Sequence, residues 1–284
     1  MENNLKTVLI TGCSTGFGRE WVSRFLERGW TVVATMRNLN ERGSLFAGEL
    51  QKYPDRLHLL SLDVTNERER KEAVEFVRTR FKRLDVLINN AGYGQFGALE
   101  DITEAQLRRQ FEVNFFGTVF LTRDLLPILR ESRGRIINLS SVAGTIGLPV
   151  SGAYCSSKFA LEGLSESLYY ELKPLGVQVC LVEPGRHRTS FSQNMEWGEK
   201  SRQPESPYRR MTESYLNRKS QLSERVVVSQ ENVVRLVVKL AESKQMPLRV
   251  SIGMDAWATR LIQALLPKRL QTTLLSLVWK KALG

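Results

Sequence analysis

Short apolar runs rich in β-branched residues alternate along this chain with longer segments that have the apolar spacing of a helix. The runs are KTVLIT, TVVAT, LHLLSLDV, LDVLINN, GRIINLSS, VQVCLVEP and LRVSIG. Helical spacing occurs between them at residues 17–28, 66–81, 103–130 and 155–173. This alternation predicts an α/β fold, a parallel sheet of about seven strands with helices on both faces. Ligands of such sheets bind beyond the carboxyl ends of the strands.

The length of 284 residues suits one α/β domain with an appendage. We expect that domain over residues 1–254 and a helical extension over 255–284. Residues 186–225 break the alternation with scattered charges and six large apolar side chains: Phe191, Met195, Trp197, Tyr208, Met211 and Tyr215. Loops of this size are usually lids, binding loops or linkers. The aromatic residues favour a lid, and a packed insertion is the alternative.

The composition is that of an ordinary globular protein, with 42% hydrophobic and 25% charged residues. The formal net charge of +11 is spread widely, and no stretch interleaves basic and aromatic residues, so we expect no nucleic-acid partner. Three cysteines without paired spacing indicate reduced thiols in a cytosol-like compartment. The N-terminus shows no signal peptide, which also predicts a cytoplasmic protein. The two histidines stand far apart, so we expect no metal site.

The end of the chain, residues 255–284, contains two helical stretches broken at Pro267. The second stretch, LQTTLLSLVW, is too short to span a bilayer, which needs about 20 residues. Lysine and arginine flank it on both sides, and a basic amphipathic end suits peripheral contact with an anionic membrane. Packing against the body of the protein or a neighbouring subunit is the alternative, and the sequence alone favours it.

The segment TGCSTGFGRE follows the first predicted strand and leads into a helix, with Gly12, Gly16 and Gly18 in the turn. A strand, a glycine-rich turn and a helix N-terminus form an anion site, since unpaired N–H groups and the helix dipole face the ligand. The spacing differs from G-x-G-x-x-G, which weakens the motif by itself.

The same turn contains Ser14 in a G-x-S-x-G pattern, the nucleophile elbow of α/β-hydrolases. That alternative needs a histidine downstream of the serine, and only His58 and His187 are present.

At the end of the second strand, in VVATMRN, Met36 and Arg37 stand where an acidic residue would bind a ribose 2′-hydroxyl. An arginine there accommodates a 2′-phosphate, which predicts NADP(H) rather than NAD(H). A solvated surface arginine is the alternative.

Three tyrosines have a lysine four residues later, a spacing that puts both side chains on one helix face. The pairs are Tyr154 with Lys158, Tyr169 with Lys173, and Tyr215 with Lys219. Tyr154 differs from the others because Ser141, at the end of a predicted strand, lies thirteen residues before it and Asn114 lies forty before it. The other two tyrosines lack this combination.

Together these residues resemble the short-chain dehydrogenases/reductases. The resemblance rests on TGCSTGFG, on NNAG at 89–92, on Asn114, Ser141, Tyr154 and Lys158, and on Pro184 and Gly185 followed by Thr189. It covers about residues 5–190. VVATMRN, VNFFGT and SKFALEGLSESL are most similar to the retinol dehydrogenase and 17β-hydroxysteroid dehydrogenase branch. The resemblance implies a single Rossmann-type doubly wound parallel sheet, with a lid insertion and a C-terminal helical extension.

The resemblance implies an NADP(H)-dependent oxidoreductase that interconverts an alcohol and a carbonyl on a hydrophobic, retinoid-, steroid- or lipid-like substrate. Tyr154 would be the general acid and base, helped by a cation, Lys158, that lowers the pKa of its phenol from about 10. By resemblance Lys158 also holds the nicotinamide ribose, Ser141 binds the substrate oxygen, and the backbone of Asn114 positions a relay water. A non-catalytic NADP(H)-binding sensor on the same fold is the alternative, and it has no need of these four residues.

The resemblance also implies the cofactor contacts. Ser14, Thr15 and Arg37 would meet the adenosine phosphate, Asp63 the adenine, Asn90 the adenosine side, and Thr189 the nicotinamide carboxamide. Asp63 as a helix cap is the alternative. The full set is Gly12, Ser14, Thr15, Gly16, Phe17, Gly18, Arg37, Asp63, Val64, Asn90, Ala91, Gly92, Tyr154, Lys158, Pro184, Gly185 and Thr189.

One departure from the family pattern is the basic run Arg186, His187 and Arg188 after Pro-Gly, where small or apolar residues are usual. It predicts a basic substrate rim and leaves room for a substrate with an acidic end. The family resemblance further suggests a homodimer or homotetramer built through the helices at 103–130 and 155–173.

Overall fold

A computed structural model describes residues 5–186, 191, 194–225 and 229–283. Its centre is a seven-stranded parallel sheet in the order β3-β2-β1-β4-β6-β7-β9. These strands span Thr7–Ile10 (β1), Thr31–Met36 (β2), Leu57–Ser61 (β3), Val86–Asn89 (β4), Arg135–Leu139 (β6), Gln178–Pro184 (β7) and Arg249–Ile252 (β9). Each strand coincides with one of the seven apolar runs, with β2 extending one residue beyond its run to Met36, so the predicted doubly wound sheet is confirmed.

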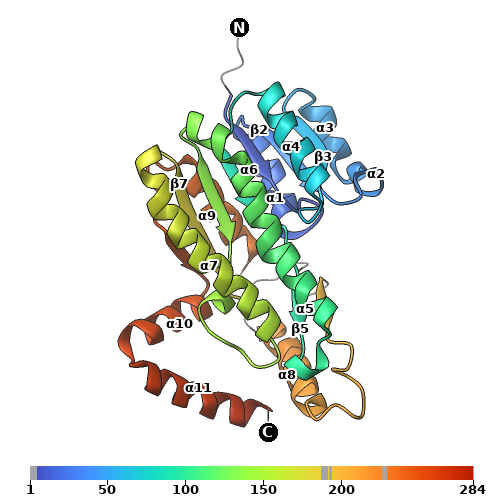
Figure 1. The fold of residues 1–284 in the computed structure, drawn as a ribbon, viewed down its shortest axis with the longest axis vertical. Helices are drawn as coiled ribbons and strands as arrows, with labels where there is room; N and C mark the ends of the chain where they lie inside the picture. The colour runs from blue at the N-terminus through green and yellow to red at the C-terminus, as the bar shows by residue number, and fades with distance from the viewer. Residues whose placement is uncertain (1–4, 187–190, 192–193, 226–228, 284) are drawn as a thin grey trace.

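Helices cover both faces of this sheet (Figure 1). On one face α1 and α9 contribute Trp21 and Val237 to a buried cluster, and on the other α4 and α6 contribute Val77 and Leu121 to a second. The covering helices span Gly16–Glu27 (α1), Glu67–Arg80 (α4), Gly117–Glu131 (α6), Gly152–Leu172 (α7) and Gln230–Glu242 (α9). Burial on both faces explains why the five inner strands are largely apolar runs, whereas the edge strands β3 and β9 are only partly buried and contain polar residues.

The strand order reverses between β1 and β4, because the chain moves outward to β2 and β3 before it returns. A reversal of this kind opens a crevice at the carboxyl ends of the two central strands. The glycine turn follows β1 and the NNAG segment runs from the end of β4, so both predicted cofactor motifs meet at this crevice. Shorter helices follow the second strand, at Leu39–Arg42 (α2) and Ala47–Lys52 (α3).

A smaller layer lies beyond the carboxyl ends of the sheet, in the lower part of Figure 1. It contains a parallel pair of three-residue strands that the sequence did not predict, since runs this short have no periodicity to recognise. Part of the expected lid belongs to this layer. The elements are Gly94–Phe96 (β5), Glu104–Phe111 (α5), Met195–Trp197 (β8) and Arg209–Arg225 (α8).

The C-terminal extension consists of α10 (Met254–Leu265) and α11 (Lys268–Leu283), separated at Pro267 as predicted. In Figure 1 the two helices form a bent arm beside the lower layer. Among the described residues, no helix has the length and apolar character needed to cross a membrane.

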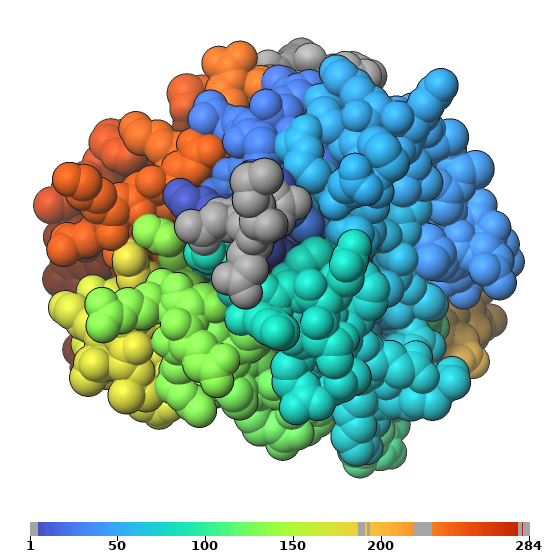
Figure 2. Space-filling view, turned by 90° about the horizontal axis from the view of Figure 1, so that it is seen from above, coloured from blue at the N-terminus to red at the C-terminus, as the bar shows by residue number. Residues whose placement is uncertain are grey.

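Figure 2 shows the opposite end of the molecule, where the strands begin. Segments from all parts of the sheet, drawn in blue, cyan, green and orange, meet there in one rounded surface. The predicted functional residues lie at the other end, at the carboxyl ends of the strands.

Candidate active site

The turn between β1 and α1 holds the glycines of the TGCSTGFG motif. Gly12 and Gly16 have φ angles of 72° and 59°, a left-handed backbone that suits glycine. A Cβ atom on Gly18 would lie 2.4 Å from the carbonyl oxygen of Gly12, so a larger residue does not fit. Thr15 is the N-cap of α1, but its side chain makes no capping hydrogen bond. The first N–H groups of α1 therefore face an anion site with no capping side chain of their own.

Asn90 fixes the shape of this turn from the neighbouring strand. Its side-chain amide donates to the carbonyl oxygens of Thr11 and Gly12, at 2.8 and 3.1 Å. The backbone N–H of Ala91 donates to the Thr11 hydroxyl at 2.9 Å. Asn90, which we expected on the adenosine side of the coenzyme, thus joins the glycine turn to the NNAG segment. Phe17, also predicted here, stacks on Trp21 with ring centroids 5.7 Å apart.

A basic pair lies beside the glycine turn. Arg37 follows β2 as predicted and is exposed. Arg42, at the end of the short helix α2, donates from Nη1 to the Ser14 hydroxyl at 2.9 Å. The sequence analysis missed Arg42, although its place five residues after Arg37 in RNLNERG was a usable signal. Two guanidinium groups and a hydroxyl at a helix N-terminus suit the 2′-phosphate and pyrophosphate of NADP(H).

Within the part of the chain that the structure describes, no histidine serves as the base that the hydrolase alternative needs. The Ser14 hydroxyl accepts from Arg42, which cannot act as a base. His58 packs between Phe76 and Phe81, with ring centroids 5.8 and 5.1 Å from its own. Burial lowers the pKa of His58 in this apolar setting. His187 lies outside the described residues.

Asp63 and Val64 follow β3 at the same edge of the sheet. The Asp63 carboxylate accepts from the Thr65 N–H and hydroxyl, at 2.9 and 2.7 Å. Asn66, not Asp63, caps α4 by accepting from the first N–H groups of the helix, so the capping alternative for Asp63 is wrong. Val64 is buried, and a Cβ on Gly117 would approach its Cγ2 to 2.6 Å, which shows how closely α6 passes this edge.

Asn114 sits in a π-helical turn, Glu112–Phe116, that joins α5 to α6. The extra residue of such a turn redirects a side chain, and π-turns often mark functional sites. The Asn114 carboxamide accepts from the Tyr93 N–H at 3.0 Å and donates to the Tyr93 carbonyl at 2.9 Å. It also donates to the Ser157 hydroxyl at 3.3 Å, on the same helix as Tyr154. Asn114 therefore ties the π-turn both to the segment after β4 and to α7.

Tyr154 is buried near the start of α7, with only 8% of its surface exposed. Burial raises the pKa of its phenol, and a hydrogen bond with Ser141 acts in the opposite direction. Our expectation of a lowered pKa is wrong for this structure, because burial of the side chain disfavours the phenolate. Ser141 follows β6 and also accepts from the Ala143 N–H at 3.2 Å, as a strand-end serine does.

Lys158 lies one helical turn beyond Tyr154 and is also buried. Its ammonium donates to the Leu139 carbonyl at 2.7 Å and lies 6.0 Å from the centre of the Tyr154 ring. Burial lowers the pKa of Lys158 to about 8, and the negative charge of Glu162 acts against this shift. The predicted pair thus shares one helix face, and the amine carries its charge near neutral pH.

Glu162, one turn further along α7, is a residue that the sequence analysis did not single out. It is buried, and its carboxylate accepts from Arg249 Nε at 2.9 Å. Arg249 also donates to Glu166 at 2.7 Å and lies 3.7 Å from Glu183. Burial raises the pKa of Glu162, and the contact with Arg249 opposes it. The spacing of four residues after Lys158 was the available signal.

An aromatic cluster covers Tyr154. Phe96 stacks on its ring with centroids 5.7 Å apart, and Phe191 lies at 5.5 Å. Trp197 and Tyr215, from the expected lid, lie 5.8 and 5.9 Å from Phe96. Residues of three separate segments therefore close an apolar cover over the phenol.

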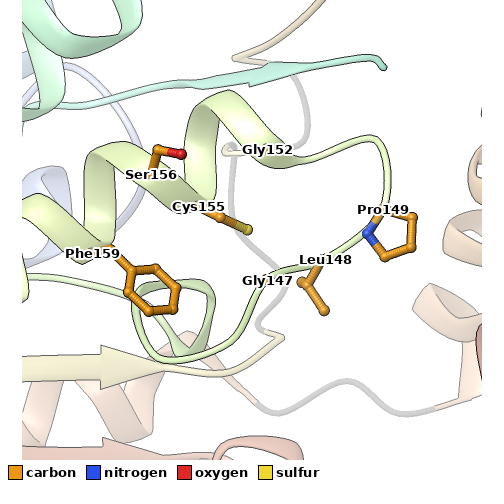
Figure 3. A pocket seen from close by; sticks show the side chains of 7 residues that line it. All are labelled: Gly147, Leu148, Pro149, Gly152, Cys155, Ser156 and Phe159. Carbon is orange, nitrogen blue, oxygen red and sulfur yellow. The ribbon is translucent and has the colours of Figure 1, made fainter. Parts of the chain in front are cut away.

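An open pocket begins beside this cover, between the loop before α7 and the first turns of that helix (Figure 3). Its lining is largely apolar and consists of Gly147, Leu148, Pro149, Gly152, Cys155, Ser156 and Phe159. Leu148 and Cys155 also belong to the cluster around Tyr154. The pocket thus adjoins the buried phenol but does not include it.

The other two tyrosines occupy different surroundings. Lys173 lies 5.5 Å from the Tyr169 ring, far along α7 from the strand ends. Tyr215 belongs to the aromatic cover, and burial raises its pKa. Only Tyr154 of the three has Ser141 and the Asn114 turn beside it.

Pro184 ends β7, and Gly185 follows it and packs against Asp255 of α10. The Gly185 N–H donates to the Ile252 carbonyl at 2.8 Å, and a Cβ on Gly185 would collide with the Asp255 carboxylate. Arg186 is exposed, and its N–H donates to Asp255 at 2.8 Å. Thr189, predicted to bind the nicotinamide carboxamide, and the basic residues His187 and Arg188 lie outside the described residues.

The chain is similar to known proteins over almost all of its length. The model of the short chain dehydrogenase family matches residues 6–200. A 3-ketodihydrosphingosine reductase from Bacteroides thetaiotaomicron is 36% identical over 249 residues, which cover 87% of each chain. A short-chain dehydrogenase from Streptomyces avermitilis superposes with a TM-score of 0.79 at 34% identity, over 97% of this chain and 99% of the other. A Burkholderia cenocepacia short chain dehydrogenase, solved in complex with NADP, gives 0.73 at 25% identity, over 96% and 99%.

Proposed function

Because the chain belongs to the short chain dehydrogenase family of oxidoreductases, we propose that it interconverts an alcohol and a carbonyl group with NADP(H), using Tyr154 as general acid and base. This proposal rests on one observation, which is that the four predicted catalytic residues lie together at the carboxyl ends of the strands. Tyr154 lies beside Ser141 and one turn from Lys158, and Asn114 hydrogen-bonds to the same helix. A sensor that only binds nucleotide has no need of this arrangement.

NADP(H) is the coenzyme that the residues at the glycine turn fit best. The N-terminal turn of α1, which has no side-chain cap, suits the pyrophosphate. Arg37, Arg42 and Ser14 would hold the 2′-phosphate, a group that NAD(H) lacks. The bound coenzyme supplies or accepts the hydride. The NADP complex of the Burkholderia cenocepacia relative supports this choice.

In the reducing direction, Tyr154 donates its proton to the carbonyl oxygen, which becomes the alcohol hydroxyl. The raised pKa of Tyr154 keeps that proton in place at neutral pH. Ser141 donates a hydrogen bond to the same oxygen, and the Lys158 ammonium stabilises the phenolate that remains. A water held at the Asn114 turn returns the proton. In the oxidising direction the same residues act in reverse order.

A hydrophobic carbonyl compound with a long chain fits the surroundings of this site best. Phe96, Phe191 and Leu148 lie around Tyr154, and the adjoining pocket is largely apolar. The name of the Bacteroides relative, a 3-ketodihydrosphingosine reductase, points to the same chemical class. Arg186 at the rim leaves room for a polar or acidic end group.

A coenzyme-oxidation screen tests this function. The purified chain is mixed with NADPH and with long-chain ketones, steroids, retinoids and acyl compounds, some with and some without an acidic end. We expect turnover of a long-chain ketone, faster with NADPH than with NADH. The absence of turnover with every carbonyl class, together with tight NADPH binding, would favour the sensor.

We also propose where the domains of this chain begin and end, how it assembles and in which compartment it works. Residues 1–254 form the catalytic domain, with the segment around 186–225 as its lid, and residues 255–284 an extension. A homodimer or homotetramer forms through the helices at 103–130 and 155–173, which expose Phe116 and Phe159. All three cysteines are free and buried, which supports a reducing compartment such as the cytoplasm.

Removing the negative charge of Glu162 is expected to move the alkaline limb of the pH profile. Glu162 raises the pKa of Lys158 against the effect of burial. In Glu162→Gln the Lys158 ammonium should therefore lose its proton at a lower pH than in the parent, and kcat/KM should begin to fall at a lower pH. The measurement is kcat/KM for NADPH-dependent reduction from neutral to alkaline pH.

Glu166→Gln is the matched control for this shift. Glu166 also accepts from Arg249, at 2.7 Å, but lies a further turn from Lys158 and does not contribute to its pKa. The control should keep the parent midpoint. Equal midpoints in the parent and Glu162→Gln would show that Glu162 does not act on Lys158.

A further inference from the structure

Helix α10 is attached to the body of the protein by its polar face. The Asp255 carboxylate accepts from the Arg186 N–H, and Arg260 forms an ion pair with the buried Glu183. Gln263 donates to the Thr145 carbonyl at 2.6 Å. These contacts fasten α10 to the segments that follow β6 and β7. A surface helix normally exposes its polar face to water, whereas α10 turns its polar face toward the body of the protein.

The outward face of α10 is apolar. Met254, Trp257, Leu261 and Leu265 recur at spacings of three and four residues, so they lie on one side of the helix. Their exposed fractions are 70%, 65%, 40% and 70%. An ordinary amphipathic helix has the opposite arrangement, with its apolar stripe toward the core. A contiguous exposed apolar stripe of this kind marks an interaction surface.

Helix α11 adds further exposed apolar residues to those of α10. The Gln271 side chain, itself buried, donates to the carbonyls of Gln263 and Leu266, at 3.2 and 2.7 Å, and this holds the bend between the helices. Beyond the bend, three exposed leucines at spacings of four and three share one face of α11: Leu270, Leu274 and Leu277. The arm is thus a fixed structure with apolar residues on both helices.

We propose that this arm binds the surface of an anionic membrane. The arm surface consists of Met254, Trp257, Leu261, Leu265, Leu270, Leu274 and Leu277 with the cations Lys268, Arg269 and Lys280. A helix with these features lies in the plane of a bilayer, with its apolar residues below the headgroups and its cations against anionic lipids. A tryptophan at the boundary is typical of such contacts.

Charge decides between a membrane and a second copy of the chain. Beyond Asp255 the sequence contains no aspartate or glutamate, whereas Lys268, Arg269 and Lys280 are exposed. Two such arms packed together would bring cations near one another without a compensating acid. Protein interfaces are also depleted in lysine. A sheet of anionic headgroups satisfies the cations and accepts the apolar side chains at once.

Membrane binding would place the candidate site at the lipid surface, a consequence that rests on the proposed function. Helix α10 is joined through Gln263 to the loop after Ser141, and through Asp255 to the segment after Gly185. An apolar carbonyl compound that partitions into lipid could then reach the pocket beside α7 directly from the bilayer.

Flotation of the full-length chain with lipid vesicles tests the proposal. Vesicles of phosphatidylcholine alone are compared with vesicles that also contain phosphatidylserine, at low and high salt. We expect binding to the anionic vesicles, weakened by salt. Lys268→Gln with Arg269→Gln should weaken it by about thirtyfold, the factor for two surface cations. Trp257→Ser with Leu265→Ser should abolish it.

Leu175→Ser is the matched control, because Leu175 is 51% exposed at the far end of α7. It should bind vesicles as the parent does. All variants should keep NADPH binding and reduction of a water-soluble ketone, so a failure of the proposed function is seen separately. Equal binding by the parent and the arm variants, or no vesicle binding at all, overturns the proposal. Self-association that Trp257→Ser with Leu265→Ser removes, without vesicle binding, would assign the arm to a second copy instead.

Discussion

Tyr154→Phe is expected to lower carbonyl turnover by about 10²- to 10⁴-fold, the usual contribution of a general acid. Phenylalanine keeps the ring that packs against Phe96, at a centroid distance of 5.7 Å, and removes only the hydroxyl group. NADPH binding should therefore be unchanged. The measurement is kcat with a reducible ketone, together with the Kd of NADPH from fluorescence titration.

Tyr169→Phe is the control, because Tyr169 has a lysine at the same spacing on the same helix. Its activity should equal that of the parent. Full activity of Tyr154→Phe on any carbonyl substrate would contradict the role of this phenol. A loss of NADPH binding along with turnover would instead show that the hydroxyl group supports the fold of the site.

The double variant Arg37→Ala with Arg42→Ala is expected to reverse the coenzyme preference. Hydrogen bonds to a charged group contribute about 1.5–3 kcal/mol each, so loss of one such contact weakens binding by about ten- to a hundredfold. Affinity for NADPH should fall by at least this factor, whereas affinity for NADH, which has no 2′-phosphate, should change little. Titration of both coenzymes against the parent and each single variant measures the effect.

Arg28→Ala provides the comparison, because Arg28 lies at the far end of α1 and pairs with Glu242 at 2.7 Å. It should leave both affinities unchanged. If the parent binds NADH more tightly than NADPH, our interpretation of Arg37 is wrong. If Arg42→Ala alone has no effect, its hydrogen bond to Ser14 does not contribute to coenzyme binding.

The sheet could be predicted from the sequence because burial on both faces leaves a simple pattern. Its five inner strands are nearly continuous apolar runs, and the long helices α1, α4, α6 and α9 each bury apolar residues against them. The pair β5 and β8 could not be predicted, since three-residue strands have no periodicity and their partners lie about a hundred residues apart. The π-turn at Asn114 was missed for a similar reason, because one extra residue in a helix does not alter its apolar spacing visibly.

The sequence predicts which residues belong to the candidate site. It does not predict how deeply they are buried or how burial shifts their pKa values. Spacing identified Asn114, Ser141, Tyr154 and Lys158. It could not show that Phe96 would stack on Tyr154, because that contact depends on the unpredicted β5. The raised pKa of Tyr154 and the lowered pKa of Lys158 both follow from burial that only the folded chain reveals. Arg42 was missed because its contact with Ser14 requires the chain to return to the glycine turn through α2.

The most direct test of the account is a titration of the Tyr154 phenol in the NADP⁺ complex. Tyrosinate absorbance is followed with pH for the parent and for Lys158→Met, and each curve is referred to the same protein carrying Tyr154→Phe. If the Lys158 ammonium makes the phenol more acidic, the midpoint for Tyr154 lies lower in the parent than in Lys158→Met. Identical midpoints in the two proteins would contradict the proposed role of the Lys158 ammonium, which is to stabilise the Tyr154 phenolate.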